Sequence, residues 1–197
     1  MMPVLGPGDP IFQSEVDMRR LFVTAMLSAV LAGFAASAQA PTEMPKPAPE
    51  LKKLDYFVGN WKSEGEMKPG PMGPGGKMSS TETLGWMEGG FFVVSHAKFE
   101  GAGMGAGSAT AYLGYDPDKK VYTYDEFNSM GEAVHSTGTV QGDTWTWLGD
   151  SKMGAQIMKG RYTMVILSPT SYSFKFETSQ DGTAWNTLME GKTTKVK

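Results

Sequence analysis

The chain has 197 residues, of which 18 are basic and 21 acidic, for a formal net charge of −3 at neutral pH. Nucleic acids bind to strongly basic surfaces, and this near balance of charge argues against a nucleic acid as partner. The sequence contains no cysteine, which excludes disulfide bonds and thiolate chemistry. Stability must therefore come from backbone hydrogen bonds and from the burial of apolar side chains.

The segment at residues 18–38 is typical of a signal peptide. Arg19 and Arg20 give it a positive start, residues 21–34 form an apolar run, and small residues follow at positions 36–38. The apolar run is too short to span a membrane as a mature helix, and no later run is long enough. We therefore expect a soluble periplasmic or secreted protein.

Two cleavage positions fit the small residues at the end of this segment. Cleavage after Ala40 would leave Pro41 as the first residue, so cleavage after Ala38 is preferred. Residues 1–17 are acidic where a signal peptide begins with positive charge, and we interpret them as a start-site artefact upstream of Met18.

A proline-rich linker and a short helix come next along the chain. Residues 39–49 contain four prolines among polar residues, a composition that favours extended backbone. Residues 50–58 carry Leu51, Leu54 and Phe57 at helical spacing before Gly59. We expect one short helix with an apolar face, followed by a single folded domain, the whole domain covering residues 50–197.

The rest of the chain consists of runs of β-forming residues separated by turn signals. The expected strands are residues 60–67, 78–87, 91–99, 109–115, 121–127, 133–140, 144–149, 156–168, 171–179 and 183–195. The connections are too short for crossover helices, so neighbouring strands should pair antiparallel. An open sheet of about ten strands would leave exposed edges, and closure into an up-and-down barrel removes them. A two-sheet sandwich is the alternative.

The order of several short motifs resembles a known family. Gly59-Asn60-Trp61 is similar to the Gly-x-Trp signature of calycin barrels, the group of the lipocalins and fatty-acid-binding proteins. The further motifs 87–91, 114–116, 127–131 and 179–182 with Trp185 are similar to those of an exported bacterial family, domain of unknown function 1579. The resemblance implies an all-β calycin-like barrel with a short N-terminal helix, in which Trp61 packs across the closed end. It implies no activity.

Aromatic and histidine side chains are the candidates for lining a cavity in such a barrel. The predicted ligand-binding residues are Trp61, Tyr112, Tyr124, His135 and Trp145. Gly65, Ala109, Ala111, Gly138 and Gly191 are small enough to leave room for a ligand. Asp125 and Glu126 must point to opposite faces of their strand, and pairing could bring either one near Glu82 or Arg161.

Metal and cofactor sites find little support in the sequence. His96 is expected on the outer face, and two histidines without a third ligand make a weak zinc site. No histidine follows His135, so the C-terminal strands offer no histidine as an axial ligand, and this disfavours haem. A copper site at Met67, Met72 and Met78 is an alternative that the loose spacing does not favour. We expect no cofactor and no catalytic residue.

The sequence favours binding over catalysis. We expect a small hydrophobic or amphipathic molecule inside the barrel, bound without reaction. Two alternatives stay open. One is a cavity enzyme of the isomerase or lyase type, which would need a buried carboxylate or histidine beside the pocket. The other is an envelope interaction module whose barrel is filled by its own side chains.

Overall fold

A computed structural model describes residues 45–70, 73–101, 105–153 and 156–197. The predicted start-site artefact at residues 1–17, the signal peptide, residues 39–44 of the linker, and Met72 lie outside these residues. The single helix in the described part of the chain is not long and apolar enough to cross a membrane.

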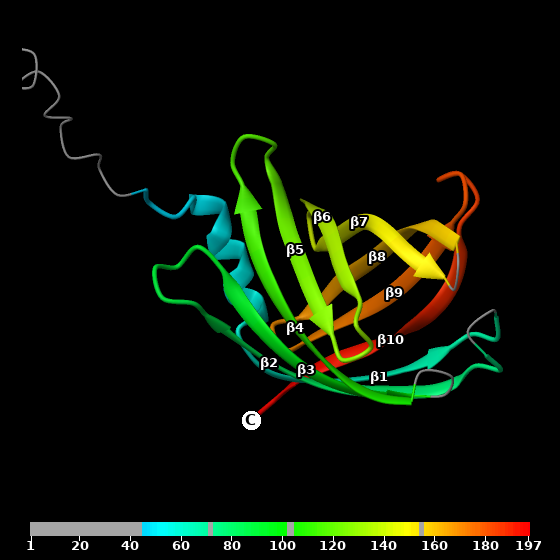
Figure 1. The fold of residues 1–197 in the computed structure, drawn as a ribbon. Helices are drawn as coiled ribbons and strands as arrows, with labels where there is room; N and C mark the ends of the chain where they lie inside the picture. Colours follow the sequence, from blue (N-terminus) through cyan, green and yellow to red (C-terminus); the bar gives the residue numbers. More distant parts are fainter. Residues whose placement is uncertain (1–44, 71–72, 102–104, 154–155) are drawn as a thin grey trace, which may run out of the picture. The chain divides into compact units, whose positions relative to one another are not determined.

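The fold is a closed antiparallel barrel preceded by one short helix (Figure 1). The helix is η1 (Pro49–Phe57). The strands are β1 (Gly59–Met67), β2 (Gly76–Trp86), β3 (Val93–Gly101), β4 (Gly105–Asp116), β5 (Val121–Asn128), β6 (Ala133–Gln141), β7 (Thr144–Met153), β8 (Gln156–Ser168), β9 (Ser171–Ser179) and β10 (Asn186–Val196). Each strand pairs with the next along the chain, and β1 pairs with β10 to complete the ring. The expected barrel is confirmed and the sandwich is wrong.

The strands follow the alternation seen in the sequence. Trp61, Ser63 and Met67 on β1 are buried and alternate with exposed Lys62 and Glu64, so the first three point into the barrel. Directly paired residues of antiparallel strands share a face. The register therefore assigns every strand residue to the inside or the outside, beginning from Trp61.

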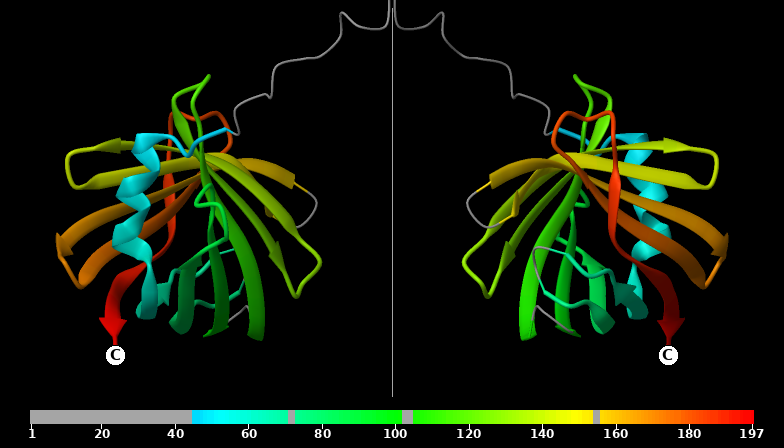
Figure 2. Two further views of the ribbon diagram at one scale, coloured as in Figure 1. Left: turned by 90° about the vertical axis from the view of Figure 1, so that its left-hand side faces the viewer. Right: turned by 90° about the vertical axis from the view of Figure 1, so that its right-hand side faces the viewer.

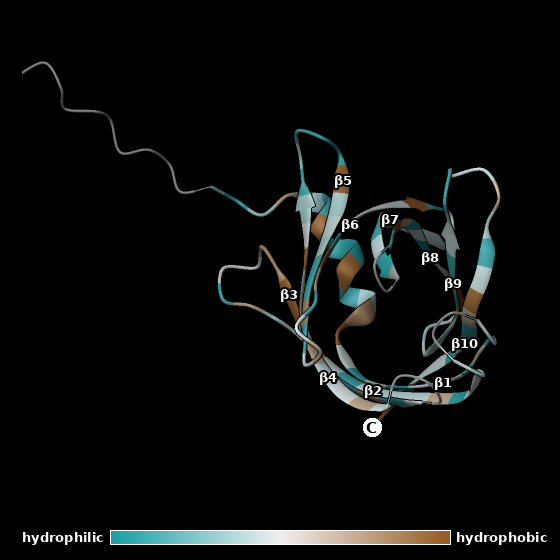
Figure 3. Ribbon diagram, turned by 45° about the vertical axis from the view of Figure 1, so that its right-hand side comes forward, coloured by the Kyte–Doolittle hydropathy of each residue, from teal (hydrophilic) through white to brown (hydrophobic). Residues whose placement is uncertain are grey.

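The helix η1 is of the 3-10 type, which explains the spacing of its apolar residues. Leu51, Leu54 and Phe57 are three residues apart, and a helix with three residues per turn places all of them on one face. All three are buried in the core of the barrel. Figure 3 shows the ring of strands in outline, and the helix η1 lies within this ring.

Hydrogen bonds join this helix to strands around the barrel. The Trp86 Nε1 of β2 donates to Asp55 Oδ1 at 2.8 Å, and the Tyr122 hydroxyl of β5 donates to the carbonyl of Glu50 at 2.9 Å. The Tyr56 hydroxyl donates to the carbonyls of Ser168 and Ser171, each at 3.0 Å. The helix ends beside the C-terminal end of β10 (Figure 2), where Lys195 Nζ donates to the Tyr56 carbonyl at 3.4 Å. The helix therefore closes one end of the barrel.

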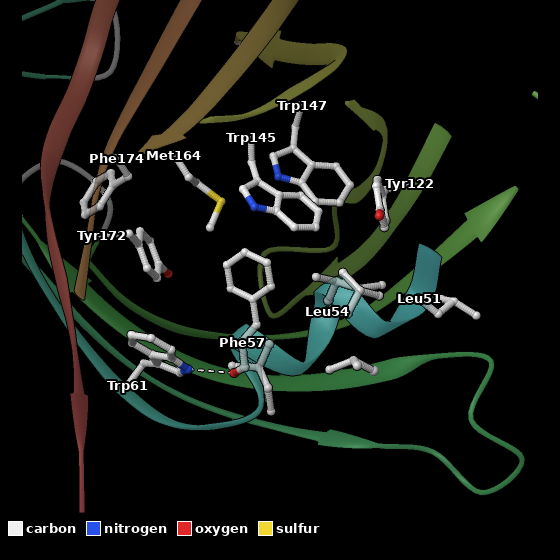
Figure 4. Packing of buried hydrophobic residues seen from close by; sticks show 13 residues of the cluster. Leu51, Leu54, Phe57, Trp61, Tyr122, Trp145, Trp147, Met164, Tyr172 and Phe174 are labelled. Atoms are coloured by element: carbon white, nitrogen blue, oxygen red, sulfur yellow. Dashed lines mark hydrogen bonds between the residues drawn. The ribbon is translucent and has the colours of Figure 1, made fainter. Parts of the chain in front are cut away.

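The closed end is filled with aromatic side chains (Figure 4). Trp61 is 2% exposed, and its Nε1 donates to the Phe57 carbonyl at 2.6 Å. The rings of Phe57 and Trp145 meet edge to face with their centroids 5.0 Å apart, an arrangement that aromatic pairs favour. The expected position of Trp61, packed across the closed end beneath the helix, is confirmed.

Candidate functional site

Charged side chains are scarce on the inner face of the barrel. Among the described strand residues that the register places inside, the acidic ones are Glu82 and Glu126 and the basic one is Lys195. Glu82 is paired with Trp61 and Ala97, and Glu126 with Ala111 and Val134. Burial of a charge is costly unless something compensates for it. These two carboxylates are therefore the unusual feature of the interior.

Each carboxylate is held by one hydroxyl group. The Ser95 hydroxyl of β3 donates to Glu82 Oε1 at 2.5 Å, and the Tyr124 hydroxyl of β5 donates to Glu126 Oε2. Tyr162 of β8 lies close enough to interact electrostatically with both glutamates. We call Glu82, Ser95, Tyr124, Glu126 and Tyr162 the interior polar cluster.

The pKa values of Glu82, Tyr124 and Tyr162 are shifted in the direction that favours neutral side chains. Burial raises the pKa of Glu82, and the charge of Glu126 raises it further, while the hydrogen bond from Ser95 opposes both. Burial likewise raises the pKa values of Tyr124 and Tyr162 well above the ordinary tyrosine value. All three side chains point into the barrel and are surrounded by protein on most sides.

The barrel interior has a filled half and an accessible half. In the half next to η1, most inward side chains are buried: Trp61, Leu84, Val93, Leu113, Tyr122, Trp145, Trp147, Met164, Tyr172 and Phe174. Trp86, Tyr115, Val140 and Ile166 are partly buried and pack against them. In the other half, most inward side chains keep some solvent-accessible surface: Met78, Ser80, Phe99, Tyr124, Glu126, Val134, Ser136, Met158, Tyr162, Phe176 and Met189. Glu82 also keeps accessible surface and lies where the two halves meet.

The polar atoms of the cluster indicate the same open space. Within the described residues, no hydrogen-bond partner is found for the Tyr162 hydroxyl, Glu82 Oε2 or Glu126 Oε1. Yet no side-chain nitrogen or oxygen that is fully enclosed there lacks a partner. These three atoms therefore border space that solvent can enter. Deep burial together with accessible surface indicates a hollow inside the barrel.

The structure divides the five residues predicted from the sequence into two groups. Trp61, Tyr124 and Trp145 point inward, the first and last as part of the filled half and Tyr124 as part of the polar cluster. Tyr112 is 37% exposed and His135 has a side chain that is 64% exposed. The register pairs both residues with Asp125, which comes directly before the inward Glu126 and therefore points outward. Paired residues share a face, so Tyr112 and His135 also point outward. The prediction that Tyr112 and His135 line the interior is wrong.

Both histidines belong to the outer surface. His135 Nδ1 lies 2.6 Å from Asp125 Oδ1, and His96 Nδ1 lies 3.2 Å from Thr110 Oγ1. The expected outward position of His96 is confirmed. No group of three or more histidine and carboxylate side chains suited to a metal ion occurs among the described residues.

Small interior residues leave less room than expected, because aromatic rings occupy the space. A Cβ atom added at Gly138 would lie 2.5 Å from the Trp147 ring, and one at Gly191 would lie 2.6 Å from the Phe174 ring. A Cβ atom at Gly65 would lie 3.1 Å from that same ring. These three glycines admit Phe174 and Trp147 into the filled half, and they do not create the hollow.

Part of the polar cluster could have been found from the sequence. Glu126 shares strand parity with the inward Tyr122 and Tyr124, and Glu82 shares parity with Leu84. Charged residues at inward positions of otherwise apolar strand faces are the signal. The sequence left open whether Glu82 lies near Glu126. The register brings them near each other, because Ser95, which donates to Glu82, is paired with Ala111, and Ala111 is paired with Glu126. The sequence gives no such signal for Tyr162, because it belongs to a long run of mixed residues on β8.

These features define a ten-stranded closed antiparallel barrel with one plugged end. The family model described as "Protein of unknown function (DUF1579)" matches residues 46–195, and the chain belongs to that family. Among curated proteins, no sequence matches the chain. The crystal structure of Rv2717c from M. tuberculosis is similar in fold, with a TM-score of 0.54 and 14% identity. The similarity covers 77% of this chain and 100% of that one.

Proposed function

We propose that this protein binds a small, partly apolar molecule in the hollow half of its barrel and does not transform it. The observation that supports this proposal most strongly is the accessible surface of side chains that lie deep inside the barrel. Ligand sites in proteins are typically concave and largely apolar, with a few polar groups that orient the ligand. Here Met78, Phe99 and Met189 supply apolar surface, and the interior polar cluster supplies the polar groups.

A pair of matched variants tests this proposal. Ala97 points into the hollow beside Glu82 and keeps accessible surface, whereas its neighbour Lys98 points outward. Ala97→Phe should place a ring in the hollow, and Lys98→Phe should place the same ring in solvent. N-phenyl-1-naphthylamine, an uncharged dye that fluoresces in apolar surroundings, serves as the probe.

The wild-type protein and Lys98→Phe are expected to enhance the dye fluorescence equally, and Ala97→Phe to lose most of the enhancement. Circular dichroism and the unfolding midpoint confirm that each variant is folded. Equal enhancement by both folded variants would place the dye elsewhere and contradict the proposal. Wild-type protein that leaves the dye dark would contradict it as well.

A second function is favoured by one specific observation. Glu82 is a deeply buried carboxylate whose pKa is raised by burial, and groups of this kind can transfer protons near neutral pH. A cavity enzyme that moves a proton on its ligand would use it as acid or base. The test incubates the protein in D₂O with the ligand that it retains during purification, and mass spectrometry measures the deuterium bound to carbon in that ligand. An enzyme incorporates deuterium there, and Glu82→Gln abolishes the incorporation. A binding protein returns the ligand without carbon-bound deuterium.

A further inference from the structure

We propose that the ligand of the hollow is an organic cation, a small molecule with a protonated amine at one end of an apolar or aromatic body. This inference rests on the proposed function and specifies the chemistry of its ligand. The hollow carries two carboxylates, Glu82 on β2 and Glu126 on β5, two strands that only β3 and β4 separate in the ring. Charge alone does not define a site, and three further features of the described residues lead to the cation.

The first feature is the lack of an internal counter-charge. No lysine or arginine nitrogen of the described residues lies within ion-pair distance of Glu82 or Glu126, whereas the outward Glu64, Glu177 and Glu190 all have such partners. Lys195, the basic residue among the inward positions, is held at the closed end. Its Nζ lies 5.0 Å from the centre of the Trp61 ring and donates to the Tyr56 carbonyl at 3.4 Å. The two carboxylates therefore have no cationic partner among the described residues. A positively charged ligand could supply one.

The second feature is the match of hydrogen-bonding atoms. The Tyr162 hydroxyl is deeply buried, and neither it nor Glu82 Oε2 nor Glu126 Oε1 has a hydrogen-bond partner among the residues that the structure describes. All three side chains interact electrostatically with one another across the hollow. A primary ammonium has three N–H donors and no acceptor. An ammonium group in the hollow can therefore donate to the carboxylate oxygens of the cluster, and such charge-assisted bonds are stronger than bonds between neutral groups.

The third feature is the surface around these atoms. The rings of Tyr124, Tyr162 and Phe176 border the hollow, and the centroids of Tyr162 and Phe176 lie 6.5 Å apart. Aromatic faces attract cations and also accept an apolar body. Ca²⁺ and Mg²⁺ fit less well, since these ions take six or more oxygen ligands and the cluster offers two carboxylates. An amphipathic amine satisfies both the polar and the apolar parts of the hollow.

Three probes with one shared body test the charge preference. They are 2-(1-naphthyl)ethylamine, 2-(1-naphthyl)ethanol and 1-naphthaleneacetate, which are cationic, neutral and anionic at pH 7.5. Their affinities are measured by isothermal titration calorimetry at low salt on the wild-type protein. Glu82→Gln and Glu126→Gln remove one interior charge each. Glu64→Gln makes the same change on an outward, exposed residue of β1 and is the matched control.

The amine is expected to bind at least about tenfold more tightly than the alcohol, with the carboxylate weakest. Each interior variant should lose most of that preference and bind the alcohol as the wild type does, and Glu64→Gln should behave as the wild type. Equal affinity for amine and alcohol, or a preference that survives both interior substitutions, would overturn the inference while leaving the proposed function intact. Failure of all three probes and of N-phenyl-1-naphthylamine to bind would overturn both.

Discussion

Glu82 and Glu126 are held differently although both point into the same hollow. Glu82 accepts its hydrogen bond from Ser95 on the neighbouring strand β3. Glu126 accepts from Tyr124, two residues earlier on its own strand, where alternate residues share a face. The Ser95 side chain is itself fully buried, so the bond fixes Glu82 against the filled half of the barrel. The burial of Glu82 affects stability as well as binding.

Glu82→Gln is expected to stabilise the protein at neutral pH. Burial raises the pKa of Glu82, so the folded protein keeps this proton at pH values where the unfolded chain has released it. The free energy of unfolding therefore falls as pH rises from the ordinary carboxyl pKa to the raised one, and remains lower above it. Glutamine cannot ionise and can still accept the Ser95 bond. The gain over wild type should be present at pH 7.5 and should vanish toward pH 4.

Urea unfolding followed by tryptophan fluorescence at the two pH values measures this effect. Glu64→Gln is the comparison. The hydrogen bond from Lys62 lowers the pKa of Glu64, so replacing this carboxylate should bring no gain in stability at pH 7.5. A Glu82→Gln protein less stable than wild type at pH 7.5 would show that the folded state stabilises the charged carboxylate.

The candidate site was only partly predictable because side-chain direction depends on register. Tyr124 was expected inside and is there, yet Tyr112 and His135 belong to strands whose two faces carry similar residues. Their outward direction follows from pairing with Asp125, which the sequence of either strand does not reveal. A register shift by one residue reverses every side chain of a strand.

At the scale of elements, the helix η1 determines where the barrel is filled. Leu54 is 0% exposed and lies at the centre of the helix face that packs into the core. Short isolated helices are unstable in water, so packing of this face must hold η1 in place. Its hydrogen bonds to β2, β5 and β10 add to that packing.

Leu54→Ala is expected to lower the free energy of unfolding by about 2–5 kcal/mol, since it removes a fully buried side chain and leaves a cavity. Lys53→Ala changes an exposed residue of the same helix and should cost less than about 0.5 kcal/mol. Thermal and urea unfolding provide both values. If the two variants lose the same small amount, the helix contributes little to the core.

The strands were largely predictable from the sequence. Two differences between the predicted and the observed strand bounds lie at turns. The bounds of β9 agree with the expected residues 171–179. The last strand was expected from residue 183 but begins at Asn186, because Asp181 Oδ1 accepts the backbone N–H groups of Thr183 and Ala184 and holds a turn. The third was expected from residue 91 and begins at Val93, since the Met87 N–H donates to the Phe92 carbonyl at 2.9 Å. Such turns depend on local hydrogen bonds, from the Asp181 side chain in one case and between backbone groups in the other, that β propensity does not represent.

At the scale of the whole barrel domain, the interior is divided rather than uniform. Most aromatic side chains next to η1 are buried, whereas Glu82, Tyr124, Glu126 and Tyr162 of the interior polar cluster keep accessible surface. The number of strands and the closure of the ring could be inferred from turn spacing and from the cost of exposed edges. How much of the interior is filled could not, because it depends on rings such as Trp147 and Phe174 folding over glycines of neighbouring strands.

Ligand binding in the barrel requires open space beside the three oxygens that lack partners among the described residues, and a high-resolution crystal structure of the protein tests for this space most directly. Ordered water or a bound molecule is expected within hydrogen-bond distance of the Tyr162 hydroxyl, Glu82 Oε2 and Glu126 Oε1, with apolar side chains such as Met78 and Met189 around it. Side chains packed against all three oxygens, with no solvent or ligand among them, would contradict the proposed binding.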